Sequence, residues 1–307
     1  MKITKNFIRS SDRQEIYYEV YEADSPKAHV HILHGMAEHI GRYEEFARYL
    51  AGKGFIVSGH DHRGHGRTAE RNNGTQGFFS DEDGFDKVVE DARKVIKAVQ
   101  AQIGDYPLIL FGHSMGSFVA RRYIQLYSDE ISRCVLSGTG GDPGAAGKFG
   151  TAFAKMNGKI NGKDTPSKTL GTLTFGSFAK EFKDEGSAFA WLTRDSSEVA
   201  KYEADPMCGF VSTNQFFVDL FSGMALISKM SEVNKIRKNL PVLLFSGADD
   251  PVGDKGKGVF AAAKQFKKAG MTDVAVYLAE GGRHELLKEI DKQLHYKTLS
   301  EWISAYD

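Results

Sequence analysis

The feature that most constrains this chain is a short glycine-serine-glycine turn near its middle. The apolar run Leu108-Ile-Leu-Phe111 leads into Gly112-His-Ser-Met-Gly116, and a helix-like segment follows at once. A strand that turns this sharply into a helix holds its central residue, Ser114, in a strained conformation, and the flanking glycines leave room for the close chain. The serine hydroxyl then stands clear of the sheet, beside the free N–H groups of a helix N-terminus. Because the bare pattern is common, it needs support from elsewhere in the sequence.

Length, charge and cysteine content narrow the classes of protein open to this chain. Its 307 residues suffice for one large α/β domain, including one with an inserted piece. Lysine plus arginine equals aspartate plus glutamate at 40 each, so there is no excess of basic residues that would indicate binding to nucleic acid. Cys134 and Cys208 have no metal-ligand spacing and predict no disulfide framework. Residues 1–20 lack the apolar core of a signal peptide and no run approaches the roughly 20 apolar residues of a membrane span, so we expect a cytoplasmic protein.

Strand-like and helix-like segments alternate along most of the chain. Residues 15–21 alternate with period two, whereas residues 88–103 carry apolar residues at helical spacing. Strands are expected at 15–21, 28–33, 55–58, 108–111, 133–137, 242–246 and 274–278, and helices at 43–50, 88–103, through Val119 and Tyr123, at 259–268 and at 299–306 (Leu299, Trp302, Ile303, Tyr306). This alternation predicts an α/β fold with a mostly parallel central sheet and helices on both faces. Ligands of such sheets bind at the carboxyl ends of the strands.

The alternation stops between residues 140 and 237. About a hundred residues without a clear strand predict an inserted cap of helices, so that residues 1–139 and 238–307 form the two parts of the core. The inserted segment is rich in large apolar residues, and because the cap lies over the carboxyl ends of the strands, some of them must face the serine. They are Phe149, Phe153, Met156, Phe175, Phe178, Phe182, Phe189, Trp191, Phe210, Phe216, Phe217, Phe221 and Met224.

Two later loops supply the partners that a serine nucleophile needs. A serine hydroxyl reacts at neutral pH only with a base within hydrogen-bond reach, and the base must be oriented by a third group. In this architecture an acid and then a histidine follow the serine, each after a later strand. Asp249 and Asp250 come directly after the strand at 242–246, and His284 follows the strand at 274–278. The residues alone do not choose between the two aspartates.

With these residues, the chain resembles α/β-hydrolases of the monoacylglycerol lipase and lysophospholipase group. The similarity rests on five ordered motifs: His34-Gly-Met-Ala-Glu-His39, Gly59-His-Asp-His-Arg-Gly-His-Gly66, Gly112-His-Ser-Met-Gly116, Gly247-Ala-Asp-Asp-Pro-Val252 and Gly282-Arg-His-Glu285. The resemblance implies an α/β-hydrolase fold, with Ser114 as nucleophile, His284 as general base and acid, and Asp250 as the orienting acid. It also implies that the N–H groups of Met36 and Met115 form the oxyanion hole. A smaller residue commonly occupies the Met36 position in this family, so the bulky side chain bears on the acyl length accepted.

The resemblance and the apolar cap predict hydrolysis of carboxylic esters of lipid-like substrates, such as monoacylglycerols or lysophospholipids, through an acyl-enzyme. We expect a small-molecule ester substrate, transient contact with lipid aggregates and no cofactor. The oligomeric state cannot be read from the sequence. A metal interpretation of His60, Asp61, His62 and His65 fails, because Gly64 stands where the zinc-binding pattern needs an aspartate.

Two alternatives stay open. An aminopeptidase related to proline iminopeptidases would need carboxylates to hold a substrate ammonium, and the cap offers Asp184, Glu185, Glu198 and Glu203. A non-catalytic small-molecule receptor could keep the same fold and pocket. Dehalogenases and epoxide hydrolases of this fold place an aspartate at the elbow, so Ser114 argues against both.

Overall fold

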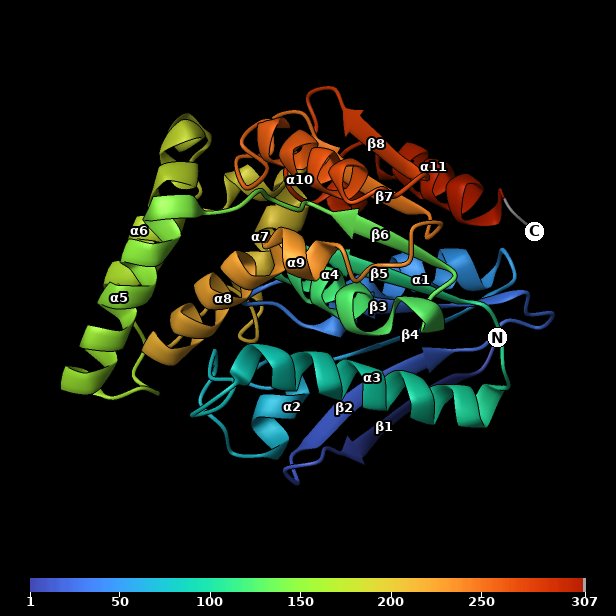
Figure 1. Cartoon of the computed structure of the whole chain (residues 1–307), viewed down its shortest axis with the longest axis horizontal. Coiled ribbons are helices and arrows are strands. Elements are labelled where there is room, and N and C mark those ends of the chain that lie inside the picture. Colours follow the sequence, from blue (N-terminus) through green and yellow to red (C-terminus); the bar gives the residue numbers. More distant parts are fainter. Residues whose placement is uncertain (306–307) are drawn as a thin grey trace.

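The chain is described here by a computed structural model that covers residues 1–305. Its centre is an eight-stranded sheet: β1 (Ile3–Arg9), β2 (Glu15–Tyr21), β3 (Ala28–Leu33), β4 (Phe55–His60), β5 (Leu108–His113), β6 (Arg133–Ser137), β7 (Val242–Gly247) and β8 (Val274–Ala279). The strands lie in the order β1-β2-β4-β3-β5-β6-β7-β8 (Figure 1). β1 pairs antiparallel with β2, and β2 antiparallel with β4, whereas every pairing from β4 through β8 is parallel. The predicted α/β fold with a mostly parallel sheet is confirmed.

Helices connect the strands and cover the sheet. The α-helices are α1 (Glu44–Ala51), α2 (Gly66–Arg71), α3 (Gly84–Ile103), α4 (Met115–Tyr127), α5 (Gly144–Asn161), α6 (Lys168–Glu181), α7 (Ser196–Ala204), α8 (Asn214–Ile227), α9 (Met230–Val233), α10 (Lys257–Lys268) and α11 (Lys292–Ser304). Short 3-10 turns are η1 (Ile40–Tyr43), η2 (Ser128–Glu130), η3 (Lys183–Glu185), η4 (Ala190–Leu192) and η5 (Leu286–Lys288). None of the described helices combines the length and the apolar character needed to cross a membrane.

The apolar run of β5 is continuous because both faces of this central strand are buried. Leu108 and Leu110 pack into one core, shared with residues of α3, α4, α8 and α10. Ile109 and Phe111 point the other way, into a second core shared with α1 and α11. Successive side chains of a strand alternate between the two faces, so a strand covered on both sides has no polar positions to spare. This double burial fixes the end of β5, and with it the elbow.

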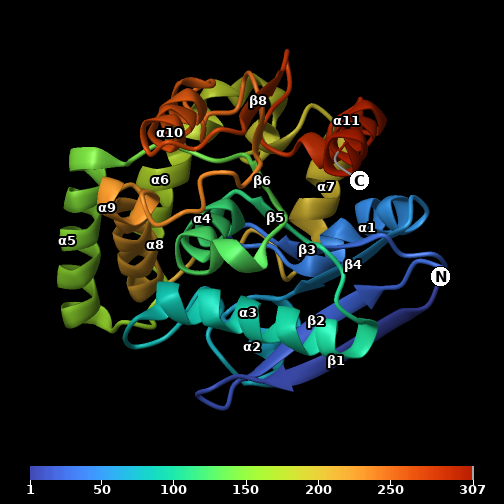
Figure 2. The ribbon, with the colours of Figure 1, turned by 45° about the vertical axis from the view of Figure 1, so that its right-hand side comes forward.

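Between β6 and β7 the described chain runs through helices and forms no strand. Both views place α5 and α6 beyond the end of the sheet, away from α3 and α11 (Figures 1 and 2). α8 differs, because Phe216 and Phe217 are fully buried in the main core together with Phe79. These two aromatic residues therefore stabilise the sheet-covering layer rather than a separate cap core. The boundaries predicted for the cap, 140–237, remain a prediction.

The predicted elements differ from the structure mainly at their ends. The polar N-terminus gave no strand signal, yet Ile3–Arg9 forms β1 by pairing along the whole of β2. α11 begins at Lys292, seven residues before the predicted start, and the predicted contribution of Tyr306 lies outside the described residues. β1 mixes polar residues with Ile3, Phe7 and Ile8, which are half-buried against the core, and this irregular pattern gives no clear strand periodicity.

Candidate active site

The glycine-serine-glycine turn joins β5 to α4 as a strained elbow. Ser114 has φ 51° and ψ −120°, in the left-handed region that residues other than glycine rarely adopt. A Cβ atom on Gly112 would lie 2.3 Å from the carbonyl oxygen of Gly116, and one on Gly116 would lie 2.1 Å from that of Leu33. Only glycine fits at either position. The backbone N–H of Ser114 donates to the carbonyl of Ser137 on β6 at 2.8 Å, which fixes the turn against the neighbouring strand.

Asp250 and His284 lie in loops at the same edge of the sheet. The Nδ1 atom of His284 is 2.9 Å from Oδ1 of Asp250, and both side chains are buried. Asp250 also accepts from the Val252 N–H at 2.9 Å and from the Ser246 hydroxyl at 3.1 Å. Burial opposes charge on Asp250, but His284 and the Val252 N–H hold the pKa of this carboxyl below its ordinary value. The structure thus brings the predicted acid and the predicted base into direct contact.

Asp249 is exposed and its backbone N–H pairs with the carbonyl of Gly282. The geometry therefore distinguishes the two aspartates where sequence chemistry could not, and it favours Asp250.

The imidazole of His113 and the indole of Trp191 flank the ring of His284. The ring of His113 lies 4.7 Å from that of His284 and the indole of Trp191 lies 5.1 Å from it, measured between ring centroids. Burial disfavours the charged imidazole, yet Asp250, followed by Glu285 and Glu38, raises the pKa of His284 above its ordinary value. Burial and then the charge of His284 lower the pKa of His113 to about 4. His284 is therefore the ring suited to take up a proton, and His113 stays neutral.

The loop after β3 lies against Ser114. A Cβ atom on Gly35 would be 3.2 Å from the Cβ of Ser114 and 2.7 Å from Oε1 of Glu38. The next residue, Met36, lies in a turn at the edge of the same cavity as Ser114. Met115 is the first residue of α4, where the N–H groups of a helix have no intrahelical partner. The two predicted oxyanion donors thus lie on the two segments that meet at Ser114, and their role remains a prediction.

A cavity of about 380 Å³ opens over Ser114 and His284. The inserted segment supplies most of its wall, from η4, α7, the chain before α8 and one face of α6. The residues of that wall include Gly171, Phe175, Gly176, Ala179, Phe189, Trp191, Leu192, Tyr202, Phe210 and Val211. The expectation that some apolar residues of the cap face the serine is confirmed. Phe149 and Met156, which belong to the same predicted set, point to solvent instead.

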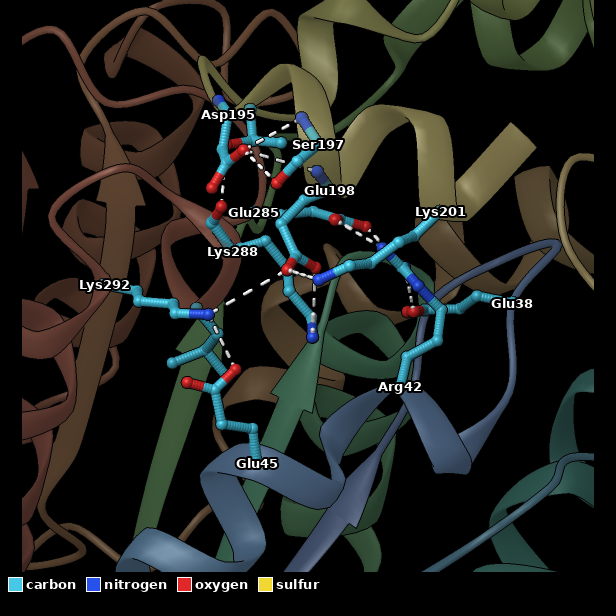
Figure 3. Close-up of polar contacts among 12 residues, drawn as sticks. Glu38, Arg42, Glu45, Asp195, Ser197, Glu198, Lys201, Glu285, Lys288 and Lys292 are labelled. Atoms are coloured by element: carbon cyan, nitrogen blue, oxygen red, sulfur yellow. Dashed lines mark hydrogen bonds and ion pairs between the residues drawn. The ribbon is translucent and has the colours of Figure 1, made fainter. Parts of the chain in front are cut away.

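Sequence reasoning left several residues of the site without a role. Glu38 and Glu285 lie in the quoted motifs, but nothing in their spacing indicates that Arg42 joins them. Arg42 is 2.5 Å from Glu38 and makes two contacts of 2.7 Å with Glu285 (Figure 3). Tyr43 also donates to Glu38, at 2.8 Å. An arginine four residues after a glutamate is a weak signal, because pairs of this spacing are common on helix surfaces.

The residues considered as metal ligands from the sequence, His60, Asp61, His62 and His65, make hydrogen bonds within the protein. His60 ends β4, where its Nδ1 lies 3.0 Å from Nε2 of His31, and Asp61 accepts from the N–H groups of Ile40 and Arg67. Elsewhere the structure brings together His39, Asp205 and Cys208. One possible ligand atom of each residue lies within 4.8 Å of those of the other two. The Gly41 N–H donates to Nδ1 of His39, so Nε2 carries the proton and donates to Asp205 at 2.8 Å. A metal at Nε2 would need that proton on Nδ1, in conflict with Gly41.

Comparison with known proteins identifies the family. A family model described as "Serine aminopeptidase, S33" matches residues 24–291. The chain is 27% identical over 309 residues to a monoglyceride lipase homolog of Monkeypox virus, covering 98% of each chain. It is 27% identical over 302 residues to the monoglyceride lipase of Homo sapiens, covering 96% of this chain and 88% of that one. A solved carboxyl esterase from Bacillus coagulans superposes with a TM-score of 0.90, at 25% identity over 99% of both chains.

These relatives confirm the resemblance drawn from the five motifs. Since the family model spans most of the sequence, the chain belongs to the serine aminopeptidase family of α/β-hydrolases.

Proposed function

We propose that this chain is a serine hydrolase that cleaves monoacylglycerols through an acyl-enzyme. Ser114 attacks the ester carbonyl while His284 takes its proton, and Asp250 holds the imidazole in the required tautomer. The N–H groups of Met36 and Met115 bind the oxygen of the tetrahedral intermediate. His284 then protonates the leaving glycerol, and a water attacks the acyl-enzyme by the same steps. The observation that carries the proposal is the Asp250–His284 hydrogen bond beneath an apolar cavity that His284 shares with Ser114.

The apolar wall of the cavity supports an aliphatic acyl group. Aromatic and aliphatic side chains dominate the lining contributed by the cap, and burial of a hydrocarbon chain there gains about 0.8 kcal/mol per methylene. The relatives compared above, named monoglyceride lipases, point to the same substrate class.

The two cations beside Glu38 and Glu285 are already paired. A small pocket there is lined by Glu38, Arg42, Tyr43, His113, Glu285, Leu287 and Lys288. Arg42 is already paired with both carboxylates, and Lys288 lies 3.5 Å from Glu198. Neither of these two cations is therefore free to bind a phosphate. We favour monoacylglycerol over lysophospholipid chiefly because the relatives compared above are named monoglyceride lipases.

The same pairing counts against the aminopeptidase alternative, although the family carries that description. An ammonium group needs an unpaired carboxylate near the serine, and both Glu38 and Glu285 are engaged by Arg42. The four acidic cap residues considered from the sequence (Asp184, Glu185, Glu198 and Glu203) are not among the described residues that line the cavity. Glu185 pairs with Arg283, and Glu198 with Lys201.

Contact with lipid aggregates is the interaction that we propose beyond the substrate. Phe149, Met156 and Ile160 on α5 are exposed by 69%, 54% and 73%, and Leu173 on α6 by 63%. Exposed lysines stand among them on α5, at positions 148, 155 and 159. An apolar helix face edged by lysines suits the headgroup boundary of a lipid surface. Both cysteines are unpaired, which supports the cytoplasmic location that we also propose.

A fluorophosphonate probe and a substrate series test the proposal. We expect stoichiometric labelling of Ser114 and hydrolysis of monoacylglycerol well above that of lysophosphatidylcholine and of aminoacyl amides. The same ester series with increasing acyl length gives the preferred chain. Absence of labelling under native conditions would favour the receptor alternative, and preference for aminoacyl amides would establish the peptidase.

A further inference from the structure

The buried arginine of the site, Arg42, makes contacts with two separate loops. Its side chain is only 10% exposed, although it carries a full charge. Its Nη1 atom donates to Oε2 of Glu38 at 2.5 Å. The guanidinium also donates to both carboxylate oxygens of Glu285, at 2.7 Å each. Figure 3 draws these three side chains with their contacts. A buried, doubly paired arginine costs several kcal/mol of desolvation, so such a cluster is weak support for stability alone.

On one side the cluster holds the loop that carries Met36. Oε1 of Glu38 accepts from the Gly35 N–H at 2.5 Å, and Gly35 lies against Ser114. The Arg42 guanidinium stacks 4.7 Å from the ring centroid of Tyr202, whose hydroxyl donates to the Ala37 carbonyl at 2.9 Å. Ala37 has φ 52°, so this turn needs external contacts to keep its shape.

On the other side the cluster holds the loop that carries His284. Glu285 is the next residue in the chain, and its N–H donates to the carbonyl of Leu192 at 2.7 Å. The Glu285 side chain is 7% exposed. The described ionisable groups that act on His284 are Asp250, Glu285, Glu38 and His113, and Arg42 is paired with the two glutamates. Counting Glu38 and Glu285 as anions and Arg42 as a cation, the cluster carries one net negative charge beside the imidazole.

We infer that Arg42 and Glu285 are positioning residues for the proposed reaction: Arg42 ties the oxyanion loop to the histidine loop, and Glu285 supplies negative charge that stabilises the His284 imidazolium. The geometry separates two effects. The guanidinium fork sets the distance between the loops, which a point charge on a flexible stem does not reproduce. The carboxylate charge sets the proton affinity of the imidazole, because a nearby anion favours its charged form.

Two conservative variants test these effects separately on a water-soluble ester. Arg42→Lys keeps the charge and loses the fork, so we expect kcat to fall about tenfold or more with KM within about twofold, since an oxyanion contact is made chiefly in the transition state. The acid limb of the pH profile of kcat/KM should stay in place. Glu285→Gln keeps the shape and removes the charge, so the acid limb should move to lower pH by about half a unit or more. Glu280→Gln, an exposed change on the loop after β8, serves as the matched control.

Both kcat and the pH profile of kcat/KM are measured for each variant. Wild-type kcat in Arg42→Lys would overturn the positioning role of Arg42, and an unmoved acid limb in folded Glu285→Gln would overturn the electrostatic role of Glu285. If Arg42→Lys does not fold, Glu285→Gln still tests the tie through its kcat, because the amide keeps one acceptor oxygen and loses the second guanidinium contact. The inference rests on the proposed function, so wild-type turnover and Ser114 labelling are measured first. Failure there refutes the function, whereas wild-type turnover with unaffected variants refutes only this inference.

Discussion

Acid should destabilise this protein sharply below pH 6.5, chiefly because a cluster of six histidines is buried without charge. They lie along β3 and β4 and in the loops that follow these strands: His29, His31, His34, His60, His62 and His65. Burial lowers the pKa of His29 to about 3 and that of His65 to about 4, and it lowers the pKa of the other four well below the ordinary value. Their contacts are those of neutral rings, such as Nε2 of His31 at 3.0 Å from Nδ1 of His60.

The sign and size of the effect follow from proton linkage. Each histidine has a folded pKa below its unfolded value of about 6.5, so the unfolded chain binds more protons as pH falls through that value, and stability is lost. Between pH 6.5 and 5.5 each contributes a loss of about 1 kcal/mol, or about 6 kcal/mol in all. Two buried carboxyls act in the opposite direction, because burial raises the pKa of Asp61 to about 6 and that of Asp219 to about 7. They return about 2 kcal/mol, which leaves a net loss of about 4 kcal/mol from these eight groups.

Urea unfolding at a series of pH values measures this loss. A net change of about 4 kcal/mol is a large part of the 5–15 kcal/mol typical of domains, and it should lower the urea midpoint by about 1 M or more between pH 6.5 and 5.5. The same interval between pH 8.5 and 7.5 serves as the control, since these histidines do not titrate there. A midpoint that is as steady from 6.5 to 5.5 as in the control interval would refute the reasoning.

Three further predictions concern the site and the cap. Asp250→Asn should lower kcat by about ten-thousandfold, as expected when the acid that orients a catalytic histidine is neutralised, while Asp249→Asn changes it little; the reverse order in a steady-state ester assay would move the acid to Asp249. Gly35→Ala places a methyl group against Glu38 and displaces the oxyanion loop, so kcat for a soluble ester should fall by roughly a hundredfold, and an unchanged rate would remove that loop from the site. Ile160→Asp should slow hydrolysis of vesicle-bound monoacylglycerol without changing that of a short soluble ester, and equal rates on vesicles would count against contact through α5.

The sequence predicted the parts of the fold that depend on local pattern and on short motifs. The strand at Leu108, the elbow and the two later loops follow from apolar runs and glycine positions, and the structure places Asp250 and His284 in contact. Strand β1 was missed because its apolar residues Ile3, Phe7 and Ile8 stand among polar ones without regular alternation, and the strand is held by pairing with β2.

The polar cluster was not predictable for a different reason. Arg42 and Glu285 are 243 positions apart, and nothing in the composition of either segment indicates that they meet. Similarly, Phe149 and Phe216 look alike in sequence, yet one is exposed and the other fully buried, because only the packing of α8 against α3 and α4 decides which side faces the core.

The measurement that tests the central claim most directly is the turnover of a monoacylglycerol by Ser114→Ala compared with wild type, on protein shown by circular dichroism to be folded. Removal of the nucleophile of such a triad typically costs about a millionfold, so we predict turnover at the level of the uncatalysed background and no labelling by a fluorophosphonate. Turnover by the folded variant comparable with that of wild type would contradict the account.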